Sequence, residues 1–205
     1  MPEDEVALEQ KRIANRKNYY KLQDEGSNNE ITIAVARPLI IESFVYLNHL
    51  PLDMDKKGQA LSVGCREGFE MDIMERVGFK NVVGIDIAIS TLDQAKNGHS
   101  VVQADMHSLP FKNECFGFIY SRHSLEHSYD PKKVLEECTR TLSPGGILFV
   151  IVPWEVEEEE TVPYHTYRFI KPHSLRILID EERINILEYF GKNGIELWLI
   201  GEKRT

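Results

Sequence analysis

The sequence lacks several features that would assign it directly to a class of protein. It has no apolar run approaching the roughly 18 residues of a membrane-spanning helix, which predicts no membrane insertion. Its first residues, MPEDEVALEQ, are acidic and favour a helix over a secretory signal. It has only three cysteines, Cys65, Cys115 and Cys138, whose spacing fits no metal site. These absences predict a cytoplasmic protein with reduced thiols and no bound metal.

An excess of basic residues is also lacking. The formal net charge is −9, whereas proteins that bind a phosphate backbone usually carry a basic surface. One basic cluster, within residues 11–21, is interpreted as a solvated helix face because acids surround it, with an RNA contact as the alternative. We therefore expect no nucleic-acid partner.

The sequence does contain an alternation of strand-like and helix-like segments, in a chain whose 205 residues suit one domain. Apolar runs predict strands at residues 60–64, 81–86, 100–104, 116–121 and 146–152. Helical spacing predicts helices at residues 67–77, 91–96 and 132–142. The alternation indicates a Rossmann-like, doubly wound α/β fold with a mostly parallel sheet.

The two ends of the chain depart from this alternation. Residues 1–55 predict an N-terminal helical cap of two helices, at 6–23 and from Pro38 to Pro51, ahead of the core at 56–153. Residues 154–205 predict a substrate loop, a short helix at 175–179, and a hairpin. The acidic run from Glu155 is interpreted as a solvated loop, with a lid that attracts a cationic acceptor as the alternative. The hairpin strands, 184–190 and 195–200, flank Gly191-Lys192-Asn193-Gly194 and bring the sheet to seven strands with an antiparallel end.

Ligands of open α/β sheets bind beyond the carboxyl ends of the strands, so these ends supply the candidate site residues. The first strand ends in residues 64–68 (GCREG), whose glycines allow a tight bend before a helix N-terminus. Asp86 ends the second strand and suits the two hydroxyls of a ribose. Asp105 ends the third and suits an adenine amino group, with Ile87 and Met106 against the ring. An ordinary turn or a surface acid is the alternative for each.

Longer segments around these residues follow one another in a fixed order: LSVGCREGFE, VVGIDIAISTLDQAK, VVQADMHSLPF, CFGFIYSRHSLEHSYDP and LEECTRTLSPGGILFVIVP. They resemble, in this order, the motifs of the class I S-adenosylmethionine-dependent methyltransferases, specifically the type 11 group. The resemblance covers roughly residues 58–153, and the C-terminal hairpin agrees with the family's sixth and seventh strands.

The resemblance implies S-adenosylmethionine as the cofactor, bound by residues at the strand ends: Gly64, Cys65, Arg66, Gly68, Asp86, Ile87, Asp105, Met106 and Ser121. The chain departs from the family at Ser62, Arg66 and Gly117, where an acid, a glycine and an aspartate are usual. We expect the Arg66 side chain either to turn outward or to pair with the cofactor's carboxylate.

A sulfonium methyl is already activated, so the protein mainly aligns the acceptor and excludes water. A base is needed only where the acceptor loses a proton, and His127 and His165 are the candidates. A packing or loop histidine is the alternative for each. We expect a small-molecule or sugar-type acceptor.

Three other functions fit parts of the sequence. His123, Glu126 and His127 spell the H-x-x-E-H motif of inverted zinc metallopeptidases, although Pro131 leaves little room for the helix that the motif needs. The substitutions at Ser62 and Arg66 are compatible with a non-catalytic protein that binds the cofactor or a partner. An NAD-dependent oxidoreductase is disfavoured because residues 64–69 do not form G-x-G-x-x-G.

Overall fold

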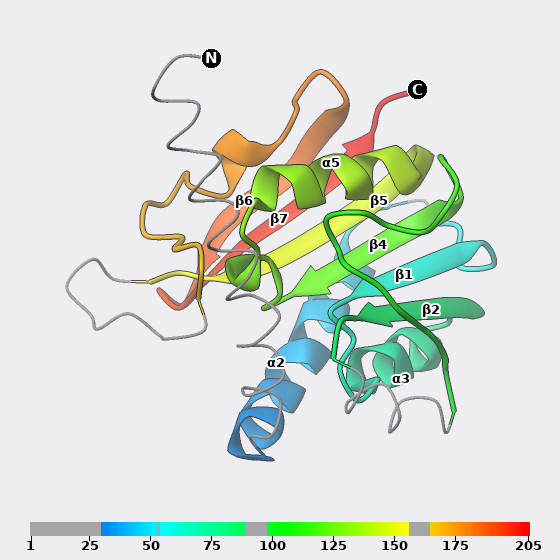
Figure 1. Ribbon diagram of the computed structural model, residues 1–205, viewed down its shortest axis with the longest axis horizontal. Helices are drawn as coiled ribbons and strands as arrows, with labels where there is room; N and C mark the ends of the chain where they lie inside the picture. Colours follow the sequence, from blue (N-terminus) through cyan, green and yellow to red (C-terminus); the bar gives the residue numbers. More distant parts are fainter. Residues whose placement is uncertain (1–29, 53, 89–97, 156–164) are drawn as a thin grey trace.

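The computed structural model describes residues 30–52, 54–88, 98–155 and 165–205 (Figure 1). The predicted helices at 6–23 and 91–96 lie outside these ranges. The strands are β1 (Gln59–Val63), β2 (Asn81–Asp86), β3 (Ser100–Gln103), β4 (Phe116–Arg122), β5 (Leu142–Pro153), β6 (Ile184–Lys192) and β7 (Glu196–Lys203). The α-helices are α2 (Glu30–His49), α3 (Phe69–Arg76) and α5 (Pro131–Thr141), and the 3₁₀ helices are η1 (Leu125–His127) and η2 (Arg176–Leu178).

The strands form one seven-stranded sheet in the order β3-β2-β1-β4-β5-β7-β6. The pairs from β3 to β5 are parallel, and β7 is antiparallel to both β5 and β6. The predicted doubly wound α/β fold with a C-terminal antiparallel hairpin is confirmed. The chain winds outward in opposite directions from β1 and β4, so the point between their carboxyl ends is where a ligand is expected.

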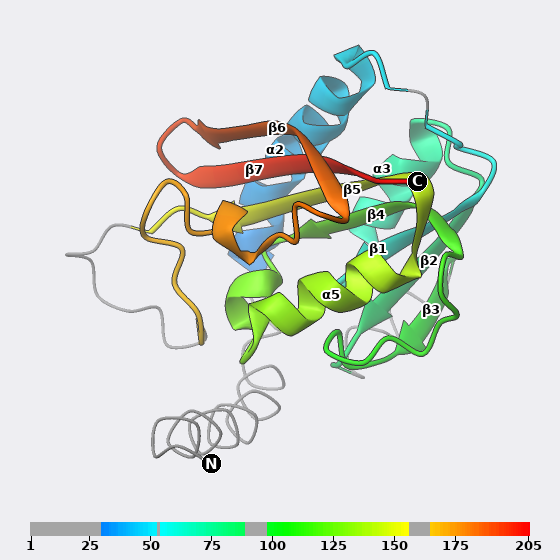
Figure 2. The same cartoon turned by 90° about the horizontal axis from the view of Figure 1, so that it is seen from above.

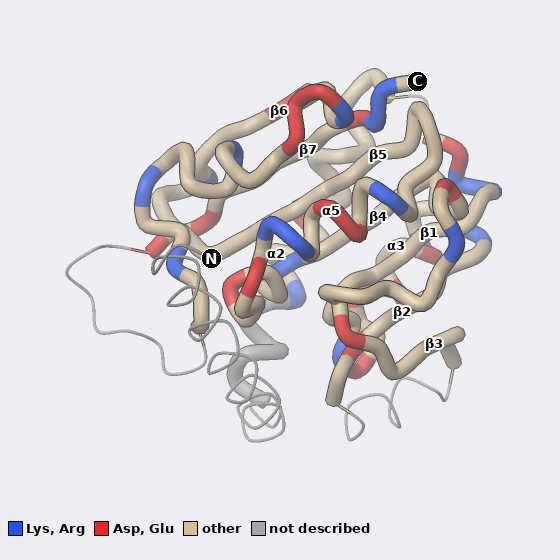
Figure 3. Tube along the Cα trace, turned by 45° about the horizontal axis from the view of Figure 1, so that its top comes forward, with Lys and Arg blue, Asp and Glu red and all other residues tan. Residues whose placement is uncertain are grey.

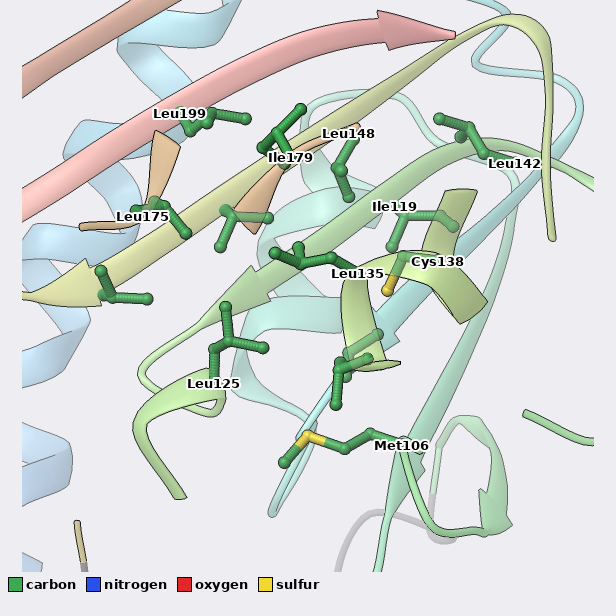
Figure 4. Packing of buried hydrophobic residues seen from close by; sticks show 14 of the residues in the cluster. Met106, Ile119, Leu125, Leu135, Cys138, Leu142, Leu148, Leu175, Ile179 and Leu199 are labelled. Atoms are coloured by element: carbon green, nitrogen blue, oxygen red, sulfur yellow. The ribbon is translucent and has the colours of Figure 1, made fainter. Parts of the chain in front are cut away.

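Helices cover both faces of this sheet (Figures 1 and 2). On one face lie α2 and α3, where the Phe44 ring lies 4.7 Å from the Tyr120 ring and the Phe79 ring 4.6 Å from the Phe118 ring. On the other face lies α5, whose Leu135 and Cys138 pack over β4 and β5 (Figure 4). Because β5 is buried from both sides, its residues 146–152 can be almost continuously apolar, as the sequence indicated.

The surface of α5 carries charges of both signs in successive turns (Figure 3). Glu137 forms ion pairs with Lys133 at 3.6 Å and with Arg140 at 2.8 Å. The Asp130 side chain caps the helix by accepting a hydrogen bond from the Lys133 N–H, and Pro131 occupies the first turn. These features explain why the predicted helix at 132–142 forms.

Two predicted helices differ from the structure. The second N-terminal helix was expected to start after Pro38, but α2 starts at Glu30 and contains Pro38. Pro38 is exposed, so water can bond the carbonyl that loses its partner there. The helix predicted at 175–179 is only the 3₁₀ turn η2.

Among the described residues, no helix combines the length and the apolar character needed to cross a bilayer.

Candidate functional site

The bend after β1 is hydrogen-bonded to β2. The N–H groups of Gly64 and Cys65 both donate to the Ile85 carbonyl at 2.9 Å. Gly64 has a φ of +74° and Gly68 a φ of +87°, a region that favours glycine. A Cβ on Gly64 would also lie 2.1 Å from the Ser124 hydroxyl oxygen. Glycine at position 64 is therefore required both by the backbone and by the segment after β4.

Arg66 adopts a left-handed backbone conformation, which glycine adopts more readily. Its φ is +45°, which costs a non-glycine residue about 1 kcal/mol. Its N–H donates to Asp86 Oδ2 at 3.0 Å, so the strained residue joins the bend to the end of β2. The direction of its guanidinium relative to a bound cofactor stays a prediction.

Asp86 lies half-buried at the end of β2, next to this bend. Its Oδ2 accepts the Arg66 N–H, and its Oδ1 accepts the Ala88 N–H at 2.9 Å. These bonds fix the carboxylate at the carboxyl end of β2, next to β1 and beside the point where the chain reverses its winding. Each carboxylate oxygen can accept more than one hydrogen bond, which suits a pair of neighbouring hydroxyls.

The N-terminus of α3 follows the bend. Its N-cap is Gly68, and no side chain caps the first turn. Amide N–H groups without a capping side chain attract a carboxylate or a phosphate. The bend, the helix N-terminus and Asp86 thus form a cradle whose donors and acceptors fit a ligand that has a carboxylate and a ribose.

Two candidate cofactor residues turn their side chains into the protein. Cys65 is fully buried, and its Sγ lies near Gly84 and Met71, under α3. Burial raises the pKa of this thiol well above its usual range. Ser121 is 4% exposed and lies in register between Val63 and Val150. Cys65 therefore offers a ligand its backbone only.

The residues after β3 form a network that sequence reasoning missed. Asp105 Oδ1 accepts the His107 N–H at 2.9 Å and lies 2.6 Å from His107 Nδ1. His107 Nε2 lies 2.6 Å from the Ser128 hydroxyl, and its ring stacks on Tyr129 at 3.6 Å. The local Asp-x-His spacing indicated a turn at most. The sequence did not indicate that Ser128 and Tyr129 contact His107, because β4 and a loop separate them from it in the chain.

The hydrophobic candidates for the adenine lie next to this network. Met106 is only 5% exposed and belongs to the core under α5, at the same end as Leu125 (Figure 4). Ile87 is half-buried and packs against the same core. Of the two, Ile87 has more surface to offer a ring.

The end of β4 is held by buried charges. Arg122 lies 2.5 Å from Glu196 at the start of β7, with both side chains almost fully buried. His123 Nε2 lies 2.8 Å from the same carboxylate, and the Trp198 indole N–H donates to it at 2.9 Å. Burial alone would raise the pKa of Glu196, but the His123 hydrogen bond, the charges of Arg122 and His123, and the Trp198 hydrogen bond outweigh it and lower the pKa to about 2.

The two histidine candidates come together beyond β4. Glu126, His127 and His165 place one potential ligand atom each within 4.8 Å of one another, and the histidine rings are 5.2 Å apart. The N–H groups of Thr166 and Tyr167 donate to the Glu126 carbonyl at 2.9 and 3.0 Å. These bonds attach the segment that follows β5 in the chain to η1.

Glu155 orients His165 from behind. Its Oε1 lies 2.6 Å from His165 Nδ1, and its Oε2 accepts from Arg168 Nε at 2.5 Å. The acidic run from Glu155 was expected to be a solvated loop, but Glu155 itself is only 9% exposed because these two partners bind it. Residues 156–160 of that run lie outside the described residues.

The metallopeptidase interpretation of H-x-x-E-H is contradicted by the geometry. The motif needs a sustained helix, whereas η1 has three residues and His123 precedes it with a φ of +48°. His123 bonds Glu196 and is not part of the group that Glu126 and His127 form with His165.

The comparisons with known proteins agree with this architecture. Residues 61–150 match a family model described as a methyltransferase domain. A ubiquinone biosynthesis O-methyltransferase of Coxiella burnetii is 30% identical over 121 residues, 55% of this chain and 51% of the relative. A tRNA U34 carboxymethyltransferase of Campylobacter hominis is 29% identical over 117 residues, which are 53% of this chain and 41% of the relative. The chain thus spans about half the length of the curated relatives it matches.

Solved structures share the fold at low sequence identity. A chain from the complex between the Haloferax volcanii Trm112 methyltransferase activator and a methyltransferase has a TM-score of 0.73 at 16% identity, covering 89% of this chain and 97% of that one. An S-adenosylmethionine-dependent methyltransferase from Mesorhizobium loti has a TM-score of 0.63 at 16% identity, covering 80% and 98%. Residues 61–150 thus match the methyltransferase domain model, and the chain shares the fold of S-adenosylmethionine-dependent methyltransferases.

Proposed function

We propose that this protein is an enzyme that transfers a methyl group from S-adenosylmethionine to a small-molecule or sugar-type acceptor. The observation that carries the proposal is the cradle at the ends of β1 and β2, beside the switch point, where Asp86 and the bend at residues 64–68 are hydrogen-bonded to each other next to the N-terminus of α3. When bound, the cofactor supplies an electrophilic methyl group. The protein's own residues hold the cofactor, align the acceptor and exclude water.

Each part of the cofactor has a matching group. Asp86 accepts the ribose hydroxyls, while the first-turn amides of α3 and the backbone of residues 64–68 hold the methionine end. Ile87 covers the adenine, with Met106 behind it in the core and Asp105 at the edge of the ring. Ser121 lies near the end of β4, in register with β1 and β5, and is proposed to lie beneath the bound cofactor.

The acceptor is proposed to bind at Glu126, His127 and His165. A hydroxyl or ammonium acceptor must lose a proton when it takes the methyl group. If Nδ1 of His165 carries the proton that it shares with Glu155, Nε2 remains as a base that faces the cluster. His127 lies beside it and shapes the same wall.

The acceptor class is proposed from the names of the relatives and from the net charge of the chain. The relatives named above act, by their names, in ubiquinone biosynthesis and on tRNA. The net charge of −9 favours a small molecule over an RNA, because phosphate binding needs a basic surface.

Calorimetric titration of the purified chain with S-adenosylmethionine, S-adenosylhomocysteine and NAD tests the cofactor. We expect binding of the first two only, weakened at least tenfold in Asp86→Asn and unchanged in the control Glu136→Gln, an exposed site on α5. Binding of NAD alone, or an Asp86→Asn variant that binds normally, would contradict the proposal. Release of S-adenosylhomocysteine with phenolic and sugar hydroxyl acceptors then distinguishes an enzyme from a binding protein.

A further inference from the structure

Glu126 is a buried carboxylate whose surroundings do not fully satisfy it. Its side chain is 1% exposed, and Oε2 has no hydrogen-bond partner. Two imidazole nitrogens lie within 4.0 Å of its Oε1: His123 Nδ1 at 4.0 Å and His127 Nε2 at 3.9 Å. Both distances exceed that of a hydrogen bond. A buried carboxylate without a close partner is costly, which suggests that a ligand completes its surroundings.

Glu126 forms a three-residue group with the imidazoles of His127 and His165. The potential ligand atoms of Glu126, His127 and His165 are all within 4.8 Å of one another. The His127 and His165 side chains are 24% and 14% exposed, so the group opens on its histidine side and is closed behind Glu126.

The surroundings of His165 resemble those of a metal-bound histidine. Such a histidine usually donates its second ring N–H to a carboxylate, which orients the ring and raises its basicity. Glu155 Oε1 lies 2.6 Å from His165 Nδ1, and Arg168 holds the other Glu155 oxygen at 2.5 Å. Nε2 of His165 is then the ligand atom.

We propose that Glu126, His127 and His165 bind a divalent transition-metal ion such as zinc. Two histidines and one glutamate are a ligand set of zinc sites that keep a fourth position open. Ligand distances of roughly 2.0–2.2 Å require ligand atoms about 3.3 Å apart, so the group must contract by up to about 1.5 Å, to which rotation of the partly exposed His127 side chain can contribute. This contradicts the sequence-based expectation of no metal.

The second cluster of this kind among the described residues differs in one respect. Asp72, Glu75 and His99 also bring ligand atoms together, but both carboxylates are half exposed to water, which satisfies them without an ion. This cluster therefore serves as an internal control.

The ion has a consequence for the proposed reaction. With a metal bound, the histidine nitrogens are ligands and no longer bases. A hydroxyl acceptor at the open position then has a lowered pKa and loses its proton to water. Only this consequence rests on the proposed function, because metal binding itself is measured without the cofactor.

Titration of the full, untagged, EDTA-treated chain with Zn²⁺, and with Co²⁺ followed by its visible absorption, tests the site. We expect one ion per chain in the Glu126–His127–His165 group. The affinity should fall at least tenfold in Glu126→Gln, His127→Ala and His165→Ala, and by a smaller factor in Glu155→Gln. His99→Ala should bind as the parent does.

Thermal unfolding keeps the test valid if a variant is unstable. Zn²⁺ should raise the Tm of the parent and of His99→Ala but not that of His127→Ala. The His127 side chain is partly exposed, so its replacement by alanine should leave the protein folded. Equal affinity in the parent and in His165→Ala, or a loss of binding in His99→Ala alone, would overturn the proposal. Binding of S-adenosylmethionine in EDTA, measured in parallel, reports on the cofactor site separately.

Discussion

At the carboxyl edge of the sheet, the ends of β1 and β2 are held by hydrogen bonds that main-chain N–H groups donate, whereas the end of β4 is held by buried charges. Gly64 and Arg66 bond β2 through their N–H groups. Arg122 and His123 instead bond the Glu196 side chain, more than 70 residues away in the chain. The first region should therefore be sensitive to changes of backbone shape, and the second to changes of charge.

The largest effect is expected at Glu196. Glu196→Ala leaves the nearly fully buried Arg122 without its partner, which should lower the free energy of unfolding by about 3–5 kcal/mol. Urea denaturation measures this change. Glu202→Ala, at a half-exposed site of the same strand, should change it by less than about 0.5 kcal/mol. Equal effects of the two substitutions would mean that buried charge does not hold β4.

Gly64→Ala tests the backbone side of the comparison. The new Cβ meets the Ser124 hydroxyl and forces a positive φ on alanine, so unfolding should cost about 2–4 kcal/mol less. Ser124→Gly in the same chain removes the clash but not the strain, and should restore about half of the loss. A Gly64→Ala variant as stable as the parent would contradict the close contact. Chemical denaturation of the parent and of these two variants measures both contributions.

Glu70, in the first turn of α3, should respond to pH in the opposite sense to Glu196. Burial raises the pKa of Glu70 to about 7, against the smaller lowering effects of its own backbone and of Arg122 and Arg66. Glu70 therefore lowers the free energy of unfolding as the pH rises from about 4.5 to 7. Above pH 7, Glu70→Gln should be more stable than the parent by on the order of 1–2 kcal/mol.

At Glu196 the lowered pKa stabilises the fold above its ordinary value of 4.5, and this stability is lost as the pH falls toward 2. Denaturation of Glu70→Gln and Glu196→Gln across pH 3–8 measures both windows. Stability differences from the parent that run in the same direction with pH would refute the contrast.

The smallest effect is expected for Arg66→Gly. Glycine relieves the φ of +45° and should raise the stability by about 1 kcal/mol or less. If the guanidinium pairs with the cofactor's carboxylate, the same variant should bind S-adenosylmethionine more weakly in a calorimetric titration. Binding at least as tight as that of the parent would exclude the pairing.

The same contrast explains which features of the fold and the site could be predicted from the sequence. Gly64 and Asp86 could be named as candidates because each lies at the end of a predicted strand, and the mostly parallel sheet followed from the alternation of strands with helices. The contacts of Glu196 with Arg122 and of His107 with Ser128 were missed, because they join residues that only the folded sheet brings together. His165 was named as a candidate, but the Glu155 carboxylate beside its ring was not, since an acid in an acidic run was interpreted as solvated.

The attachment of the post-β5 segment to η1 has a consequence for how such a domain can diverge. The Glu126 carbonyl accepts the Tyr167 amide, and any residue other than proline can supply that amide. Substitutions at position 167 can therefore alter the shape and polarity of this wall without displacing its chain. At the acceptor site proposed above, new preferences could therefore arise by single codon changes while the proposed cofactor cradle, at the ends of β1 and β2, stays intact.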